Sequence, residues 1–488
     1  MEGRPTYTLT RWVFLRALGV IYLIAFVSLW VQVQGLIGSG GILPAREYLD
    51  ALRGSLGPER YRLVPTVFWL GAGDGALRLV CGLGVLCAAL VACDVAPAAC
   101  LALLWVLYLS LASVGRDFLS FQWDVLLLEA GFLAIFFAPG HVLPARGSRP
   151  VSKPALFMLW WLLFRFAFQS GVVKLTWQDP TWLHLTALDY HFTTQPLPTL
   201  LAWYAQQLPA WFKKLSVLVT YVLEMGFPFL IFGPRRLRQI ACAGTVLLQV
   251  LIFATGNYNF FNLLTIALAL LLLDDALWVR VLPGGGRLVA RLAPSRDSAG
   301  GGRTVARVRL AILGAVFFVS CVEFVQGLSP RGFRPPSGVL AWVEPLRTVN
   351  SYGLFRVMTT RRVEIVVEGS DDGSTWHAYD FKYKPGDVTR APVLVEPHHP
   401  RLDWQMWFAA LASYEQTPWF EPFLARLLEG SPAVLGLLGR NPFPARPPKY
   451  VRALAYEYRF TTGPERRATG AWWHRTLLGT YSPPASLR

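Results

Sequence analysis

The stretch FLSFQWDVLLLEAGFLAIFFAP, residues 118–139, is long and apolar enough to cross a lipid bilayer, yet it contains Asp124 and Glu129. A carboxylate in hydrocarbon is energetically expensive, so such residues normally face the protein interior, a wet cavity or a cation. The two acids are five positions apart and therefore about 140° apart around a helix, which places them on different faces. The stretch predicts a membrane helix in which each acid needs a partner of its own.

Apolar runs of bilayer length recur through the first two-thirds of the chain. Of the 488 residues, 54% are hydrophobic and only 16% are charged, whereas soluble domains are nearer a quarter charged. We therefore expect an α-helical multi-spanning membrane bundle of about nine helices. The expected spans are 12–33, 75–93, 95–114, 118–138, 155–173, 215–233, 239–255, 259–277 and 308–326.

The net charge of +16 has the distribution of a topology signal rather than of a nucleic-acid-binding surface. Basic residues gather in the loops that this span count puts on one side of the membrane. They are Arg146, Arg149, Lys153, Arg235, Arg236, Arg238, Arg280, Arg287, Arg291, Arg296, Arg303, Arg307 and Arg309. This bias predicts an N-terminus in the cytoplasm and no nucleic-acid partner. With an odd number of spans, everything after residue 327 lies on the far side.

Two connecting segments stand out within the predicted membrane domain, residues 1–327. Residues 174–214 are too polar to span and too aromatic for an ordinary loop, which is typical of a segment at the membrane interface. Prolines divide this segment into short helices and turns. Residues 281–304 are rich in glycine and arginine and predict a flexible cytoplasmic linker.

The pattern changes to strands in residues 328–488, which we expect to form a non-cytoplasmic, mainly antiparallel β domain with inserted helices. The stretch RRVEIVVEGSDDGSTWHAYDFKYKPGD, residues 361–387, alternates, turns and resumes as a hairpin does. We expect Asp371, Asp372 and Gly373 to form the turn, with Gly373 at positive φ. Trp376 is expected to begin the return strand and to pack on the sheet.

The ionisable residues inside the predicted membrane suggest specific pairs. We expect Arg165 to meet Glu129 or Glu224 across the bundle, because such a pair relieves two burial penalties at once. The pair is either a fixed polar lock between helices or part of a functional polar cavity, and both alternatives stay open. Asp124 lies near the start of its helix, where water or Arg116 is expected to satisfy it.

Motifs for metal, phosphate or nucleophilic chemistry are not found in the sequence. It contains no HExxH spacing, no GxSxG elbow and no phosphate-binding glycine loop. Six cysteines occur in or beside apolar segments without a CxxC motif, which indicates small buried side chains. We expect neither a metal nor a cofactor.

Several long stretches resemble the lipase maturation factor family and follow in order across most of the chain. They are residues 118–139, quoted above, 164–209 (FRFAFQSGVVKLTWQDPTWLHLTALDYHFTTQPLPTLLAWYAQQLP), 255–275 (TGNYNFFNLLTIALALLLLDD), 349–387 (VNSYGLFRVMTTRRVEIVVEGSDDGSTWHAYDFKYKPGD) and 396–411 (EPHHPRLDWQMWFAAL). The resemblance implies a multi-spanning membrane protein that assists folding of secreted lipases or other exported clients. The Ala-, Arg-, Gly- and Leu-rich composition favours a bacterial member in the cytoplasmic membrane; a eukaryotic member would reside in the endoplasmic reticulum membrane.

A shorter stretch, QSGVVKLTWQDPTW at residues 169–182, is similar to part of the membrane domain of vitamin-K-dependent carboxylases. In that family a lysine at the position of Lys174 serves in catalysis. The alternative for Lys174 is an anchor at the membrane interface.

Two functional hypotheses follow. In the first, the chain is a membrane-anchored folding factor whose far-side domain presents apolar surface to a client. In the second, it is a membrane enzyme for a lipid or quinone-like substrate, with Lys174 as the base and Glu129, Arg165 and Glu224 around the cavity. A deep polar pocket that reaches both Lys174 and Glu129 would favour the enzyme.

The stretch RLDWQMWFAAL, residues 401–411, supplies candidates for client binding or for internal packing. Asp403 is a plausible N-cap of a helix that follows Arg401. Trp404 and Trp407 are three positions apart and so share one face of that helix. We expect this aromatic face to pack on the sheet, with contact to a client as the alternative.

Overall fold

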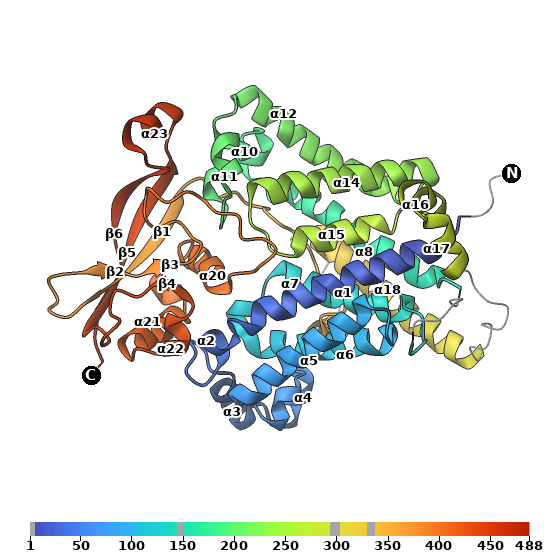
Figure 1. Cartoon of the computed structure of the whole chain (residues 1–488), viewed down its shortest axis with the longest axis horizontal. Coiled ribbons are helices and arrows are strands. Elements are labelled where there is room, and N and C mark those ends of the chain that lie inside the picture. Colours follow the sequence, from blue (N-terminus) through green and yellow to red (C-terminus); the bar gives the residue numbers. More distant parts are fainter. Residues whose placement is uncertain (1–4, 144–149, 293–302, 329–336, 488) are drawn as a thin grey trace.

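A computed structural model describes residues 5–143, 150–292, 303–328 and 337–487. Long helices form one part of the molecule and a β-rich region forms the other, with the N-terminus and the C-terminus at opposite ends (Figure 1). Arg146, Arg149 and Arg296, which contribute to the predicted topology signal, lie outside the described residues.

Six helices of the described residues are long and apolar enough to cross a membrane. They are α1 (Thr8–Trp30), α5 (Asp74–Ala92), α6 (Pro97–Gly115), which continues into η3 (Arg116–Leu119), α8 (Lys153–Thr176), α14 (Arg235–Thr255) and α18 (Arg303–Leu328). Taken together, α15 (Phe261–Leu270) and α16 (Asp275–Val281) are long and apolar enough to form a seventh span, but the chain bends by 110° between them. The chain is thus an integral membrane protein with a helical bundle.

The expected count of about nine spans is not confirmed, for two physical reasons. The helix of the opening stretch, α7 (Gln122–Phe137), has 16 residues, about 24 Å of rise against a hydrocarbon core of ~30 Å. The expected span at 215–233 is divided into α12 (Ala210–Tyr221), a π-helical segment η4 (Val222–Gly226) and α13 (Phe227–Leu230).

A polar cap fixes the start of α1 against the far end of α15. The carboxylate of Asp275 accepts hydrogen bonds from the backbone N–H groups of Thr8 (2.8 Å) and Leu9 (2.9 Å). These N–H groups have no partner within the helix, so the carboxylate satisfies them and complements the positive end of the helix dipole. The bend between α15 and α16 brings Asp275 to this position.

Short helices connect α1 to α5 on the side of the β-rich region. They are α2 (Val33–Ile37), α3 (Ala45–Leu56), η1 (Gly57–Glu59), α4 (Arg60–Leu63) and η2 (Val67–Leu70). α2 approaches the β-rich region so closely that a Cβ on Gly35 would lie 2.3 Å from the carbonyl oxygen of Ala433.

The predicted interfacial segment 174–214 forms short helices, as its prolines indicate. They are α9 (Pro180–Leu183), α10 (Ala187–Thr194), α11 (Leu200–Gln206) and the start of α12. Figure 1 shows α10 and α11 beside the sheet. The segment therefore lies between the bundle and the C-terminal region.

The predicted linker at 281–304 is only partly described. Residues Gly285–Leu292 form a short helix, α17, whose apolar and basic side chains alternate with helical spacing. Residues 293–302 lie outside the described residues.

The C-terminal region contains antiparallel sheets with inserted helices, as expected. Strands β2 (His377–Ala378), β1 (Arg362–Ser370), β5 (Tyr450–Phe460) and β6 (Trp473–Ala485) form one sheet in that order, and β3 (Asp380–Phe381) pairs with β4 (Leu438–Arg440). The other elements are α19 (Ser337–Val343), η6 (Glu344–Leu346), α20 (Arg401–Ala409), η7 (Tyr414–Gln416), α21 (Phe420–Leu428), α22 (Pro432–Leu435) and α23 (Gly463–Thr469).

The predicted hairpin turn is confirmed. Gly373 has φ of 74° in the turn between β1 and β2. The return strand is shorter than expected, because it begins at His377 and breaks before Asp380 joins the second sheet. Trp376 packs against the sheet through the guanidinium of Arg452, which lies 4.1 Å from its ring centroid.

The largest hydrophobic core among the described residues runs through both parts of the molecule. It contains Phe14 and Tyr22 on α1, Leu127 on α7, Ile365 on β1 and Phe423 on α21. The C-terminal region is therefore packed onto the bundle rather than tethered to it.

Candidate functional site

Helix α7 presents its first carboxylate to the C-terminal region. Arg401 at the start of α20 binds Asp124 through both oxygens, at 3.0 Å from Nη1 to Oδ2 and 2.8 Å from Nη2 to Oδ1. Tyr108 on α6 donates a 2.5 Å hydrogen bond to Oδ1, and Arg401 Nη1 also donates to the carbonyl of Phe118 at 2.5 Å. A bidentate guanidinium–carboxylate pair of this kind is both strong and directional.

The expectation that water or Arg116 satisfies Asp124 is wrong. The side chain of Asp124 is 0% exposed because the start of α20 covers this end of α7. Arg116 instead lies over the ring of Tyr48, 5.2 Å from its centroid.

The second carboxylate of α7 joins three parts of the chain. Arg165 on α8 donates from Nη2 to Oε1 of Glu129, which confirms one of the two predicted pairings. Oε2 accepts hydrogen bonds from the backbone and side-chain nitrogens of Asn350, both at 3.0 Å, and from the hydroxyl of Tyr352 at 2.8 Å. The pair is therefore closed off by the segment that leads into the C-terminal region.

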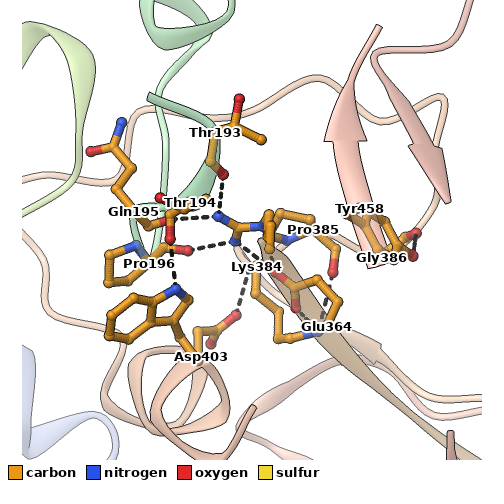
Figure 2. A network of polar contacts seen from close by, with 12 residues as sticks. Thr193, Thr194, Gln195, Pro196, Glu364, Lys384, Pro385, Gly386, Asp403 and Tyr458 are labelled. Carbon is orange, nitrogen blue, oxygen red and sulfur yellow. Dashed lines mark hydrogen bonds and ion pairs between the residues drawn. The ribbon is translucent and has the colours of Figure 1, made fainter. Parts of the chain in front are cut away.

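A third polar contact fixes the sheet to the segment after α10 (Figure 2). The guanidinium of Arg362 on β1 donates to the carbonyls of Thr193 (2.8 Å), Gln195 (2.5 Å) and Pro196 (2.8 Å). Glu364 binds Arg362 at 2.6 Å and Lys384 at 2.8 Å, so the two cations share one buried carboxylate. This arrangement of Arg362, Glu364 and Lys384 fixes the sheet to the 193–196 segment and is structural.

Asp403 belongs to this contact and is not the predicted N-cap. Pro400 occupies the N-cap position of α20 without a side-chain hydrogen bond. The Asp403 carboxylate accepts from the backbone N–H groups of Tyr383 (2.8 Å) and Lys384 (2.9 Å). Burial raises the pKa of Asp403, and these two N–H groups oppose the rise.

The tryptophans of α20 pack on the helical part of the molecule. Trp404 is buried, and its ring lies 4.7 Å from Trp123 and 5.8 Å from Tyr258, centroid to centroid. Trp407 is half-buried and donates from Nε1 to the carbonyl of Thr194 at 2.8 Å. The expected packing of this face on the sheet is replaced by packing on the bundle side.

A groove of about 570 Å³ lies between α7, α20 and the segment before β1. We call it the junction groove; its apolar lining residues are Phe121, Trp123, Pro196, Tyr258, Leu354, Phe355, Val357, Trp404, Trp407, Phe408 and Leu411. Val357, Phe408 and Leu411 are 56%, 41% and 49% exposed. Trp404 thus belongs to the floor and Trp407 to the wall of a groove with an accessible apolar rim.

Sequence reasoning missed the rim residues. Phe408 and Leu411 follow the two tryptophans on α20, but the spacing of the tryptophans draws attention to the buried face instead. The available signal in the sequence is the uninterrupted apolar run WFAAL, residues 407–411, which is too long for one buried face of a helix. Nothing in the local pattern around Val357 indicates that it meets this helix.

The other predicted charges form a separate site in the bundle. Lys174 on α8 binds Glu224 on η4 at 2.6 Å and also donates to the carbonyl of Ser170 at 2.8 Å. Gly171 allows this approach, because a Cβ there would lie 2.6 Å from the side chain of Met225. Both ionic groups line a mainly apolar cavity, here called the bundle pocket.

The set proposed for the enzyme hypothesis is divided. Lys174 and Glu224 line the bundle pocket, whereas Glu129 and Arg165 are absent from its lining and are enclosed by Asn350 and Tyr352. Within the described ranges, no group of three or more His, Cys, Asp or Glu side chains is arranged to hold a metal ion.

Comparison with known proteins matches both parts of the chain. A family profile described as the lipase maturation factor transmembrane domain matches residues 9–280, and one described as the lipase maturation factor C-terminal domain matches residues 348–483. The chain belongs to the lipase maturation factor family. The carboxylates of α7 thus lie in the transmembrane domain of this family, and Asn350, Tyr352 and Arg401 lie in its C-terminal domain.

The chain is similar to curated members of the lipase maturation factor family over most of their length. The chain is 40% identical to lipase maturation factor 2 of Gallus gallus, over 98% of this chain and 81% of the relative. It is 37% identical to lipase maturation factor 2 of Homo sapiens, over 98% and 83%, and 38% identical to lipase maturation factor 1 of Bos taurus, over 100% and 91%. No solved structure matches the chain.

Proposed function

We propose that this protein is a membrane-anchored maturation factor that assists the folding of exported lipases, and that the junction groove receives the client. The main support is the accessible apolar rim of the junction groove. The buried ion pairs Asp124–Arg401 and Glu129–Arg165 hold the elements around the groove in place. Contiguous apolar surface of this kind is typical of protein interaction sites. The names of the relatives support a lipase as the client.

The enzyme hypothesis has less support, because Lys174 and Glu129 do not share a cavity and Lys174 is already paired with Glu224. A folding factor needs no reaction centre, and its client site would be the junction groove that the two domains form together.

We further propose that the C-terminal domain lies outside the cytoplasm, in a bacterial cytoplasmic membrane. Support comes from basic residues that lie away from the C-terminal domain. Arg235 binds Asp274, which precedes Asp275, the residue whose carboxylate caps the start of α1. Figure 1 shows α16 and α17 near the chain's N-terminus, at the opposite end from the sheet. This arrangement matches the cytoplasmic bias of basic residues.

Co-expression with an exported lipase tests the role of the groove. Leu411→Asp places a charge on the rim, and the specific activity of the secreted lipase should fall about tenfold, the effect of ~1.4 kcal/mol on client binding. The matched control is Leu477→Asp on β6, which is 55% exposed and does not line the groove. Membrane levels of both variants are measured by immunoblot. Unchanged lipase activity with Leu411→Asp at normal membrane levels would exclude the groove as the client site.

A further inference from the structure

The bundle pocket lies between α8, the α12–η4 helix, α14 and α15. Its volume is about 110 Å³, which is comparable to cavities that hold one small organic molecule. Apolar side chains supply most of the lining, among them Phe166, Leu223, Leu248 and Phe261. Leu354 from the C-terminal domain also lines the pocket, so that domain helps to close it.

Polar groups without partners face this apolar space. Gln249 on α14 is only 5% exposed, and its Oε1 has no hydrogen-bonding partner among the described residues. His191 on α10 also lines the pocket, and its ring makes edge contacts with Phe192 and Phe355 rather than hydrogen bonds to any described residue. A buried polar atom without a partner is costly, so Gln249 Oε1 points to an occupant that can donate a hydrogen bond, and the half-buried His191 ring offers a second polar group.

The charges in the pocket select a neutral occupant. Lys174 and Glu224 neutralise each other at 2.6 Å. Burial and the nearby ammonium of Lys174 lower the pKa of His191 to about 4, so its imidazole is uncharged at neutral pH, with one donor and one acceptor nitrogen. The polar groups therefore offer both donors and acceptors but no net charge, which fits hydroxyl or ester groups better than an ion.

Two outward-lying helices, α12 and α14, contribute to the wall of the pocket. Thr220 on α12 and Thr245 and Ile252 on α14 are half-buried lining residues. α14 is among the least enclosed of the candidate spans, with 22% of its apolar window buried, and its neighbouring residue Leu251 is 54% exposed. The wall of the pocket that α14 forms is therefore the one closest to the lipid-facing surface.

We propose that the bundle pocket binds the head group of a neutral, single-chain glycerolipid of the monoacylglycerol type, whose acyl chain leaves between η4 and α14. The hydroxyl groups donate to Gln249 Oε1 and to the acceptor nitrogen of His191. The Lys174–Glu224 pair forms the polar end of the site. The binding requires no chemical step and is independent of a lipase client.

Photo-crosslinking of the purified full-length protein in nanodiscs tests this proposal. The probe is a monoacylglycerol with a diazirine in its acyl chain, and labelled peptides are mapped by mass spectrometry. Labelling should concentrate on the peptides around Thr220 and Thr245 and should be displaced by unlabelled monoolein. Uniform labelling of all outward-facing helices, or labelling that monoolein does not displace, would overturn the proposal.

A matched pair of variants separates the pocket from the general lipid surface. Leu248→Trp fills the pocket and should abolish the displaceable labelling, whereas Leu251→Trp, three positions along α14 on its outward face, should retain it. Gln249→Leu keeps the volume of the side chain and removes its hydrogen bonds, so displaceable labelling should fall about fivefold. Equal labelling of Leu248→Trp and Leu251→Trp would contradict the site.

Competition distinguishes the head group. Monoolein should displace the probe at lower concentration than oleic acid, because Lys174 is already paired with Glu224 and leaves an ionised carboxylate without a free counter-charge. Stronger displacement by oleic acid would overturn the neutral head group.

Discussion

Individual residues on α7 hold the two domains together through buried charge. Asp124 and Arg401 come from different domains and are at most 1% exposed. Buried pairs of this kind gain little net stability over apolar packing, but the loss of one partner leaves an uncompensated charge. Their effect therefore appears most clearly when a single member is removed.

Asp124→Ala should reduce accumulation of the protein in the membrane about as strongly as Glu129→Ala, because each leaves a buried arginine unpaired. The cost of such a change is on the order of 3–5 kcal/mol. Immunoblots of isolated membranes measure the effect. The double variant Asp124→Ala with Arg401→Ala should be no worse than either single change. Losses that add fully would show that the two residues act separately.

Asp371→Ala is a suitable control for these changes. Asp371 pairs with Arg446 at 3.2 Å on an exposed turn, and both side chains reach solvent. Exposed pairs contribute ~0–1 kcal/mol, so accumulation should stay near that of the unaltered protein.

Glu396 should make the stability of the protein depend on pH. Burial raises its pKa from 4.5 to about 9. The folded state therefore holds the proton more tightly than the unfolded chain, so stability is highest below the unfolded pKa and declines as pH rises from about 4.5 to 9. Thermal melting in detergent should show Tm falling between pH 6 and pH 9, and Glu396→Gln should flatten this fall.

The matched control for Glu396 is Glu457→Gln. Arg361 lowers the pKa of Glu457, so its contribution is complete well below pH 6 and the slope above pH 6 should not change. Parallel melting curves for Glu396→Gln and the unaltered protein would contradict the titration of Glu396.

At the scale of elements, α7 acts as the binding partner of the C-terminal domain. Beside its two carboxylates, Gln122 at its first turn accepts a hydrogen bond from the backbone N–H of Gly353 at 3.2 Å. Asn350 and Tyr352 bind two turns further along the helix, at Glu129. The segment that enters the C-terminal domain is thus held along one side of α7.

Tyr352→Phe should loosen this segment without unfolding the protein. The change removes one hydrogen bond to a carboxylate, worth ~1.5–3 kcal/mol, while Asn350 still binds Glu129. Hydrogen–deuterium exchange should become faster in residues 347–357 and stay unchanged in β1 and β5. Tyr204→Phe, at an exposed position, is the control. Faster exchange throughout the sheet would mean that Tyr352 stabilises the whole domain instead.

Much of the element pattern is predictable because it rests on local periodicity. The apolar runs predict the helical bundle, and SDDGS predicts the turn at Gly373, where only a residue tolerant of positive φ fits without strain. The number of spans is less predictable, because the apolar run 118–139 has the length of a membrane span, whereas the helix α7 within it has only 16 residues.

The pairing of charges is predictable only in part. Glu129 and Arg165 lie on consecutive apolar segments, and a buried acid needs a cation, so their contact could be expected from the sequence. The partner of Asp124 is 277 positions away, and nothing in local spacing specifies which distant arginine meets it. For the same reason the junction groove, which three distant segments form, is not visible in the sequence.

At the scale of the whole molecule, the C-terminal domain depends on the helical bundle for its buried polar groups. The protein partners of the Arg401 guanidinium belong to the bundle, and Arg362 binds three carbonyls of the 193–196 segment. Without the bundle Arg401 loses its carboxylate partner Asp124, Arg362 keeps only Glu364 of its hydrogen-bonding partners, and the shared hydrophobic core is cut open.

A fragment of residues 346–487, produced without the bundle, should therefore fail to fold cooperatively. We expect aggregation or a broad thermal transition by circular dichroism, in contrast to the full-length protein in detergent. A sharp and reversible transition of the fragment would show that its own core is sufficient.

The proposed orientation makes a prediction for the whole chain. A reporter that is active only in the cytoplasm, fused after residue 488, should be silent, because the proposed orientation has the opposite end of the molecule, with its basic clusters, inside. The same reporter inserted after residue 2 should be active. Activity at the C-terminal fusion would reverse the orientation and require a different number of spans.

The distance in sequence between Asp124 and Arg401 also sets an order of events during synthesis. A ribosome adds ~5–20 residues per second. The 277 positions between the two residues therefore correspond to a delay of about 15–55 s. During this interval α7 has been synthesised but Arg401 has not. Of the side chains that bind Asp124 in the folded protein, only Tyr108 is then present in the nascent chain. The buried ion pair between the two domains can thus form only after the chain has been synthesised as far as Arg401.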